Sequence, residues 1–212
     1  VVHGLTVHNV LKVRGGTIKG ELVEFGGDAL DAPGYALLAL IIGSAGMLAV
    51  TTEVTVKLVP KPERQQVILA SFDNVEKAGN AVADVIAAGI IPGGMEMMDR
   101  DAIHAAEAFV HAGYPLDVEA LLIIELDGPK AEVDELIDRV EKIALGCGST
   151  SCQISNSEQE RLLFWAGRKA AFPAVGRISP DYLCMDGTIP RGKLPDALAG
   201  IRDPGKKYGL RR

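Results

Sequence analysis

The sequence has 212 residues, enough for one large domain or two small ones. Its 48% of hydrophobic and 24% of charged residues are typical of a folded globular protein, and its formal net charge is −6. This acidity argues against a nucleic-acid partner, because binding to phosphates requires a basic surface. No apolar stretch is long enough for a transmembrane helix, so we expect at most a peripheral contact with a membrane.

The first segment is predicted to form a β-hairpin. Residues 7–13 and 17–25 are the predicted strands, and Arg14-Gly15-Gly16 is the predicted turn, because paired glycines adopt positive φ at little cost. His3 and His8 lie in this segment without a carboxylate or another histidine at the spacing of a metal site. We therefore interpret both as strand residues and predict no metal site here.

Residues 33–62 are predicted to form a helix, a turn and a strand. The nearly unbroken apolar run at 35–42 is too short to span a membrane and predicts a buried helix. The alternation that follows predicts a strand, which Pro60 and Pro62 end. The residues expected on its buried face are Thr52, Val54, Val56 and Leu58.

The turn between this helix and this strand contains Gly43, Ser44 and Gly46. Its composition alone favours a structural connection. A binding role is the alternative, because glycines let a ligand approach the backbone and the free N–H groups of such a turn can bind anionic oxygens.

After Pro62 the pattern changes to alternating strands and helices, and we predict a domain boundary there. We expect strands at 66–72, 90–98, 121–126 and 151–155, helices ending at 88 and 111, and a helix at 130–145. Asn74 is expected to cap the first helix, and Asp99 or Asp101 the second. This alternation around one antiparallel sheet predicts a ferredoxin-like α+β fold. The core is expected to include Met95, Met97 and Met98.

The next segment carries the candidate binding residues. Residues 157–172 are predicted to be a helix that begins with a capping box of Ser157 and Glu160. Arg168 near the helix end, and Arg177 in a predicted loop at 174–180, each offer a guanidinium that matches a carboxylate in two hydrogen bonds. The residues alone favour a structural role for Arg168, in which its side chain extends to solvent along an apolar surface or pairs with a surface acid.

The remaining residues are predicted to form a strand at 182–189 and a helix at 193–208 that is interrupted at Pro204-Gly205. The chain has three cysteines, and neither a disulfide framework nor a closely spaced metal pair is expected from Cys147, Cys152 and Cys184. Reduced thiols in the cytoplasm are therefore expected.

Two segments resemble one family of proteins. The first, at 41–63, reads IIGSAGMLAVTTEVTVKLVPKPE and is similar to the last segment of the FAD-binding domain in the FAD-linked oxidases related to vanillyl-alcohol oxidase. The second, at 162–191, reads LLFWAGRKAAFPAVGRISPDYLCMDGTIPR and resembles the FAD-binding subunits of glycolate oxidases. The resemblance implies an α+β fold, with residues 1–62 as the C-terminal part of a PCMH-type FAD-binding domain. Residues 63–212 would be a ferredoxin-like cap domain, truncated at its C-terminus.

The resemblance also implies a cofactor, FAD, and residues that contact it. These are the turn and the start of the strand, at Gly43, Ser44, Gly46, Met47 and Val50. The arginine of the family's WxxR pattern, here Arg168, would bind the substrate carboxylate, and Arg177 would reach the same site. The family's pyrophosphate-binding loop and its histidine and glutamate metal ligands are not in this sequence. We therefore expect part of a longer enzyme, inactive alone, and assign no catalytic or metal-binding residue.

The function implied by the resemblance is FAD-dependent oxidation of a small 2-hydroxy acid, glycolate to glyoxylate, with electrons passed from the flavin to a further acceptor. The expected partners are this substrate and the other subunits of a glycolate oxidase complex, in the cytoplasm. One alternative is a D-lactate dehydrogenase of the same family. Another is a non-catalytic fragment that serves as a scaffold or subunit-interaction module.

Overall fold

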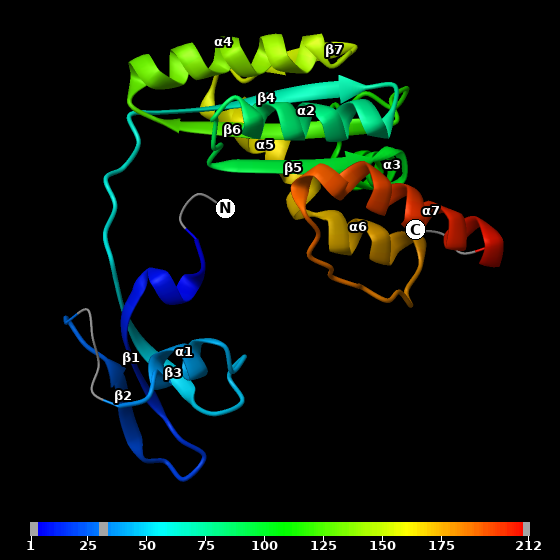
Figure 1. Ribbon diagram of the computed structural model, residues 1–212. Coiled ribbons are helices and arrows are strands. Elements are labelled where there is room, and N and C mark those ends of the chain that lie inside the picture. Colours follow the sequence, from blue (N-terminus) through cyan, green and yellow to red (C-terminus); the bar gives the residue numbers. More distant parts are fainter. Residues whose placement is uncertain (1–3, 30–33, 210–212) are drawn as a thin grey trace. The chain divides into compact units, whose positions relative to one another are not determined.

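The computed structural model describes residues 4–29 and 34–209 (Figure 1). His3, interpreted above as a strand residue, lies outside the described residues. The chain divides into two compact units, Val1–Lys61 and Pro62–Arg212, and each has its own sheet.

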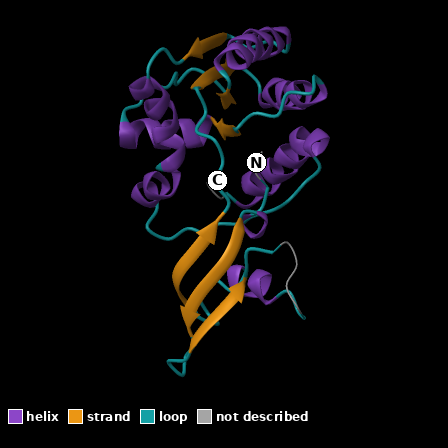
Figure 2. Ribbon diagram, turned by 90° about the vertical axis from the view of Figure 1, so that its left-hand side faces the viewer, coloured by secondary structure: helices purple, strands orange, loops and turns teal. Residues whose placement is uncertain are grey.

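The first unit is a three-stranded antiparallel sheet in the order β2-β1-β3, whose strands lie side by side (Figure 2). Its elements are η1 (Thr6–His8), β1 (Val10–Gly16), β2 (Leu22–Gly26), α1 (Leu37–Ile42) and β3 (Val50–Val56). The helix α1 packs on β2, where a Cβ at Gly26 would lie 3.0 Å from the Leu38 side chain. His8 ends η1 and is not in a strand, contrary to the sequence-based interpretation.

The predicted hairpin is present, but its turn is not at Arg14-Gly15-Gly16. These residues belong to β1 and pair with strands on both sides. The turn follows, closed by a hydrogen bond from Thr17 N to Glu21 O of 3.0 Å. Gly15 is needed for a different reason, because a Cβ there would lie 2.6 Å from the carbonyl oxygen of Val50 on β3. The glycine allows close approach of two strands and does not form the turn.

The predicted burial of α1 and of one face of β3 is wrong for the described part of this unit. No residue of α1 is buried, and every residue of β3 is exposed. The physical reason is that β3 is an edge strand and no second layer covers it among the described residues of the unit. The apolar pattern was therefore a correct signal for the elements but not for their burial.

The second unit contains a four-stranded antiparallel sheet in the order β5-β6-β4-β7. Its elements alternate as β4 (Arg64–Phe72), α2 (Val75–Ala87), β5 (Gly94–Asp99), α3 (Arg100–Val110), β6 (Ala120–Gly128), α4 (Lys130–Gly146) and β7 (Ser151–Ile154). This strand order confirms the ferredoxin-like α+β prediction, with α3 added between β5 and β6. The caps form as predicted, since Asn74 Oδ1 accepts from Glu76 N and Asp99, the correct choice of the two aspartates, accepts from Ala102 N.

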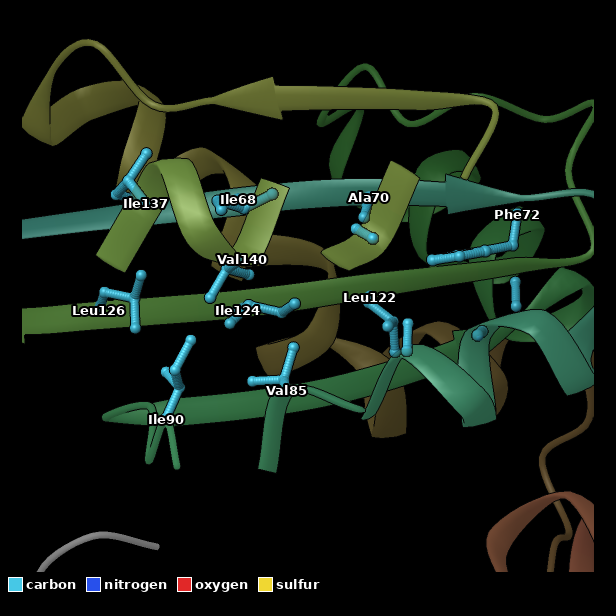
Figure 3. Close-up of a cluster of buried hydrophobic side chains, with 14 of the residues drawn as sticks. Ile68, Ala70, Phe72, Val85, Ile90, Leu122, Ile124, Leu126, Ile137 and Val140 are labelled. Carbon is cyan, nitrogen blue, oxygen red and sulfur yellow. The ribbon is translucent and has the colours of Figure 1, made fainter. Parts of the chain in front are cut away.

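The core lies on both faces of this sheet. One cluster joins alternate residues of β4 and β6 to α2 and α4, as Figure 3 shows for Ile68, Leu122 and Ile124. The other joins the intervening residues, including Leu121 and Ile123, to α3 and to Phe164 of the next helix. Burial on both faces explains why β6 is apolar without alternation. The methionines pack as predicted, with Met95 and Met97 against the first cluster and Met98 in the second.

Three helices follow the sheet: α5 (Glu158–Lys169), α6 (Ala171–Ile178) and α7 (Leu194–Tyr208), the last preceded by η2 (Arg191–Lys193). The loop predicted at 174–180 is wrong, because α6 occupies most of it. Pro173 lies in the first turn of α6, where a helix has no use for the missing N–H donor.

Two predictions for residues 182–208 are also wrong. The strand expected at 182–189 does not form, since no described strand pairs with this segment. Pro204 lies inside α7 and does not end it, so the helix continues to Tyr208 despite the missing donor.

Every helix in the described ranges falls short of the length or hydropathy of a bilayer-spanning segment. The three cysteines are free thiols. Cys147 follows the end of α4, and its Sγ donates to Asp84 Oδ2 at 3.3 Å. Burial, together with this carboxylate, raises the pKa of Cys147 to about 11, so its thiol is protonated at neutral pH.

Candidate functional site

The turn expected to contact FAD closes the end of α1. Gly43 N donates to Ala39 O at 3.0 Å, and the buried Ser44 donates its hydroxyl to Ile41 O at 2.8 Å. The serine hydroxyl therefore caps the helix end, and its proton is not free for a ligand.

The backbone after Ser44 is open. Ala45 and Gly46 both have positive φ, 51° and 79°, and their N–H groups donate to no residue that the structure describes. A Cβ at Gly46 would meet nothing within 4 Å, and the side chains of Met47 and Val50 are exposed. Free amides beside exposed apolar side chains fit a ligand with anionic groups and an apolar ring system, such as FAD.

Helix α5 begins at a well-formed cap. Ser157 Oγ accepts from Glu160 N at 3.1 Å, as the predicted capping box requires. The carboxylate of Glu160 accepts from Asn156 N at 2.7 Å, one residue earlier than the usual partner. Acidic residues in the first turn and Arg168 and Lys169 in the last turn match the helix dipole.

One face of α5 is bound to the sheet by an ion pair that is mostly shielded from solvent. The carboxylate oxygen Oε2 of Glu125, on β6, accepts from Arg161 Nη1 at 2.6 Å and from Trp165 Nε1 at 2.7 Å. The side chains of Arg161 and Glu125 are only 13% and 17% exposed. The Trp165 ring lies over Gly94 of β5, where a Cβ would lie 3.3 Å from the ring. These contacts fix the rotation of α5 on the sheet.

Arg168 lies on the same helix face, one turn beyond Trp165, because side chains three and four residues apart are neighbours on a helix. Its Nε donates to Oε2 of Glu96, on β5, at 3.1 Å. The pair is partly exposed, at 37% and 42% of the two side chains. The terminal nitrogens Nη1 and Nη2 donate to no described residue. Arg168 is thus held at one donor and open at the other end of its guanidinium.

The backbone of the same helical turn is held by Tyr114, from the segment between α3 and β6. Its hydroxyl donates to Phe164 O at 2.5 Å and accepts from Gly167 N at 3.1 Å. Burial raises the pKa of Tyr114, so the hydroxyl remains protonated and can donate.

Arg177 lies in α6 and does not share a partner with Arg168. Its guanidinium carbon lies 5.6 Å from the centroid of the Phe109 ring on α3, a cation–π contact. Among the described residues no three histidine, cysteine, aspartate or glutamate side chains converge as a metal-binding group.

Glu96, Glu125 and Tyr114 are not among the residues predicted from the sequence. For the two glutamates a signal was present, since each is a lone charge within an apolar strand segment, MEMM and LLIIEL. A charge at such a position favours a partner of opposite charge from another element.

Comparisons with known proteins relate most of this chain to one family. A sequence profile described as FAD linked oxidases, C-terminal domain, matches residues 61–212. The chain is 61% identical over 209 residues to the glycolate oxidase subunit GlcD of Escherichia coli (strain K12). This alignment covers 99% of this chain and 42% of that protein. It is 26% identical over 187 residues to a D-lactate dehydrogenase of Anaerostipes hadrus, over 84% of this chain and 39% of that protein.

Among solved structures the fold resembles alkyldihydroxyacetonephosphate synthase, with a TM-score of 0.67 and 17% identity over 94% of this chain and 41% of that chain. The chain thus spans less than half the length of these proteins. Because the family profile covers most of its residues, the chain belongs to the FAD-linked oxidases, a family of FAD-dependent oxidoreductases.

Proposed function

We propose that this chain is part of an enzyme that oxidises a small 2-hydroxy acid, glycolate, to the 2-keto acid, and that Arg168 binds the substrate carboxylate. The observation that carries the proposal is the open guanidinium end of Arg168, whose Nε is held by Glu96. A guanidinium with two free parallel donors is the protein group that best matches a carboxylate. The relative named as a glycolate oxidase subunit supports the choice of substrate.

The residues of this chain supply binding and orientation. Arg168 holds the carboxylate. The adjacent carbon, which carries the hydroxyl and the hydrogen that is transferred, then points away from Arg168. FAD, when bound, supplies the acceptor for the two electrons of the oxidation. We propose that it is contacted by the turn and strand at Gly43, Ser44, Gly46, Met47 and Val50. No residue of this chain is assigned the proton of the substrate hydroxyl.

Arg177 remains a second proposed carboxylate ligand. Its cation–π contact with Phe109 gives it a packing role that needs no substrate. Replacement of Arg177 by Lys would retain the cation, so a large loss of substrate affinity in that variant would favour a bidentate substrate contact.

The proposed partners are the substrate and other subunits of an oxidase complex, since the similar Escherichia coli protein is named a subunit. D-Lactate oxidation is the second candidate function, favoured by the D-lactate dehydrogenase relative. A scaffold role without catalysis is the third, and it predicts no change of the flavin with any 2-hydroxy acid.

The test is anaerobic mixing of the flavin-loaded enzyme that contains this chain with glycolate, D-lactate or L-lactate. We expect glycolate to bleach the flavin absorbance fastest at equal concentrations. Faster bleaching by D-lactate would transfer the assignment to the second candidate. A flavin that stays oxidised with every acid would contradict both enzymatic functions.

A further inference from the structure

The partly exposed ion pair between Arg168 and Glu96 uses only one edge of the guanidinium. Glu96 Oε2 accepts from Nε, and no described residue accepts from Nη1 or Nη2. A long flexible side chain must be ordered before it can bind a ligand in a fixed geometry, and ordering it beforehand reduces the cost at the moment of binding. The contact to Nε provides this order without occupying the two donors at the end.

Glu96 and Arg168 both lie in elements that are held in place by other contacts. Glu96 lies in β5, and its Cα pairs with that of Ile123 in β6. The backbone beside Arg168 is held by the Tyr114 hydroxyl, through Phe164 O and Gly167 N. The rotation of α5 is fixed by Glu125 through Arg161 and Trp165. The guanidinium is therefore held relative to the sheet and not only to its own helix.

The ion pair between Arg168 and Glu96 is not explained by a contribution to the stability of the fold. Ion pairs with this degree of exposure contribute little to the free energy of unfolding. The pair of Arg161 and Glu125 already ties the helix to the sheet. A second acid on the same face, bound to the Nε of an arginine whose terminal donors are free, points to a role in orientation.

We propose that Glu96 is a positioning residue for substrate binding: it fixes Arg168 through Nε and directs Nη1 and Nη2 toward the substrate carboxylate. This inference rests on the proposed function of Arg168. Glu96 also offsets part of the positive charge, so the site attracts a carboxylate through geometry more than through net charge.

The test is a double-mutant cycle between Glu96 and Arg168 in the flavin-loaded enzyme, with steady-state kinetics on glycolate. Glu96→Ala should lower kcat/KM about tenfold, because the guanidinium loses its fixed orientation. Glu96→Gln retains an acceptor for Nε and should lose less. In an Arg168→Lys background, Glu96→Ala should change kcat/KM less than about twofold, since no fork is left to orient.

A matched control is Glu119→Ala, which removes the acid of another exposed pair, Arg100 with Glu119 at 2.6 Å, neither of which belongs to α5 or β5. This variant should keep normal kinetics. Flavin content and melting temperature should be unchanged in all single variants, and Glu96→Gln serves if Glu96→Ala does not fold.

The outcomes separate this inference from the proposed function. Normal kcat/KM in Arg168→Lys would overturn the role of Arg168 itself. An impaired Arg168→Lys enzyme with a normal Glu96→Ala enzyme would overturn only the positioning role. Equal losses from Glu96→Ala in both backgrounds would also overturn it, because the effect would then not act through the guanidinium.

Discussion

The hydroxyl of Tyr114 lies 3.1 Å from the backbone nitrogen of Gly167 and also donates to the carbonyl of Phe164. A side chain from outside the helix therefore bonds to the backbone of α5 one residue before Arg168. A Cβ at Gly167 would collide with the Tyr114 ring, so glycine is required for contact and not for backbone conformation. Tyr114 thus fixes the last turn of the helix.

Gly167→Ala should lower the free energy of unfolding by about 1–3 kcal/mol, because overpacking outweighs the better helix propensity of alanine. The control is Gly200→Ala in α7, where a Cβ meets nothing within 4 Å. That change should be neutral or stabilise by up to about 1 kcal/mol. Urea unfolding followed by the fluorescence of Trp165, the single tryptophan of the chain, measures both. Equal effects of the two changes would refute the steric argument.

Tyr114→Phe should destabilise the second unit by about 1–3 kcal/mol. The ring still fills its buried place, but Phe164 O and Gly167 N lose the hydroxyl that bonds to both. The same urea titration provides the measurement. If the urea midpoint does not change, Phe164 O and Gly167 N have found other partners and the hydroxyl is not needed for stability.

Glu125→Ala should lower the free energy of unfolding by about 1–3 kcal/mol, because Arg161 keeps its pair with Glu158 but loses its partner on the sheet, and Trp165 loses its acceptor. Glu125→Gln retains one acceptor oxygen and should cost less. Glu119→Ala, which breaks an exposed pair, should stay within about 0.5 kcal/mol. The three variants are compared by thermal melting. A Glu125→Ala protein as stable as the Glu119→Ala protein would mean that the pair of Arg161 and Glu125 contributes nothing net.

The cysteines should differ in their reaction with iodoacetamide. Burial and Asp84 raise the pKa of Cys147 to about 11, and the thiolate is the reactive form. At about pH 8 the exposed Cys184 should be alkylated first, and the rate at Cys147 should still rise steeply at pH 10. Because the folded state holds this proton more tightly than the unfolded state, the thiol favours folding below its unfolded pKa and loses this effect as the pH rises toward 11. Mass spectrometry of tryptic peptides gives the rates, and equal rates at pH 8 would contradict the prediction.

Arg168→Lys should lower kcat/KM for glycolate in the flavin-loaded enzyme by about ten- to a hundredfold, since lysine keeps the charge but not the two-point match. The loss appears in KM if the contact is equal in ground and transition states, and in kcat as well if it aligns the hydrogen to be transferred. Melting temperature and flavin content serve as controls. A lower melting temperature together with lost activity would make Arg168 a structural residue.

The second unit could be predicted from sequence because its signals are local. Asn74 and Asp99 cap the helices that follow them, and strand and helix periods alternate as the sheet requires. The contacts that position Arg168 could not be predicted in the same way. Glu96 and Arg168 are 72 residues apart, so their pairing depends on the tertiary fold.

The first unit shows the opposite limit. Gly15 and Gly16 have the composition of a turn, but Gly15 is glycine because β3 passes close to it. A turn and a close approach require the same residue, and only the partner strand distinguishes them. The apolar residues of β3 likewise indicate which face of the strand could be buried. They do not indicate whether another part of the unit covers that face.

The alternation of side chains along β5 has a consequence for folding. Met95 and Met97 pack into one cluster, while Glu96 between them faces the other side of the sheet. A slip of β5 by one residue against β6 would turn the carboxylate into the layer of α2 and α4 and move the two methionines to the opposite face of the sheet. The mispaired sheet would thus contain a charge with no partner, at a large cost in free energy. The carboxylate of Glu96, which we propose orients Arg168 for substrate binding, therefore also disfavours a shifted register of β5.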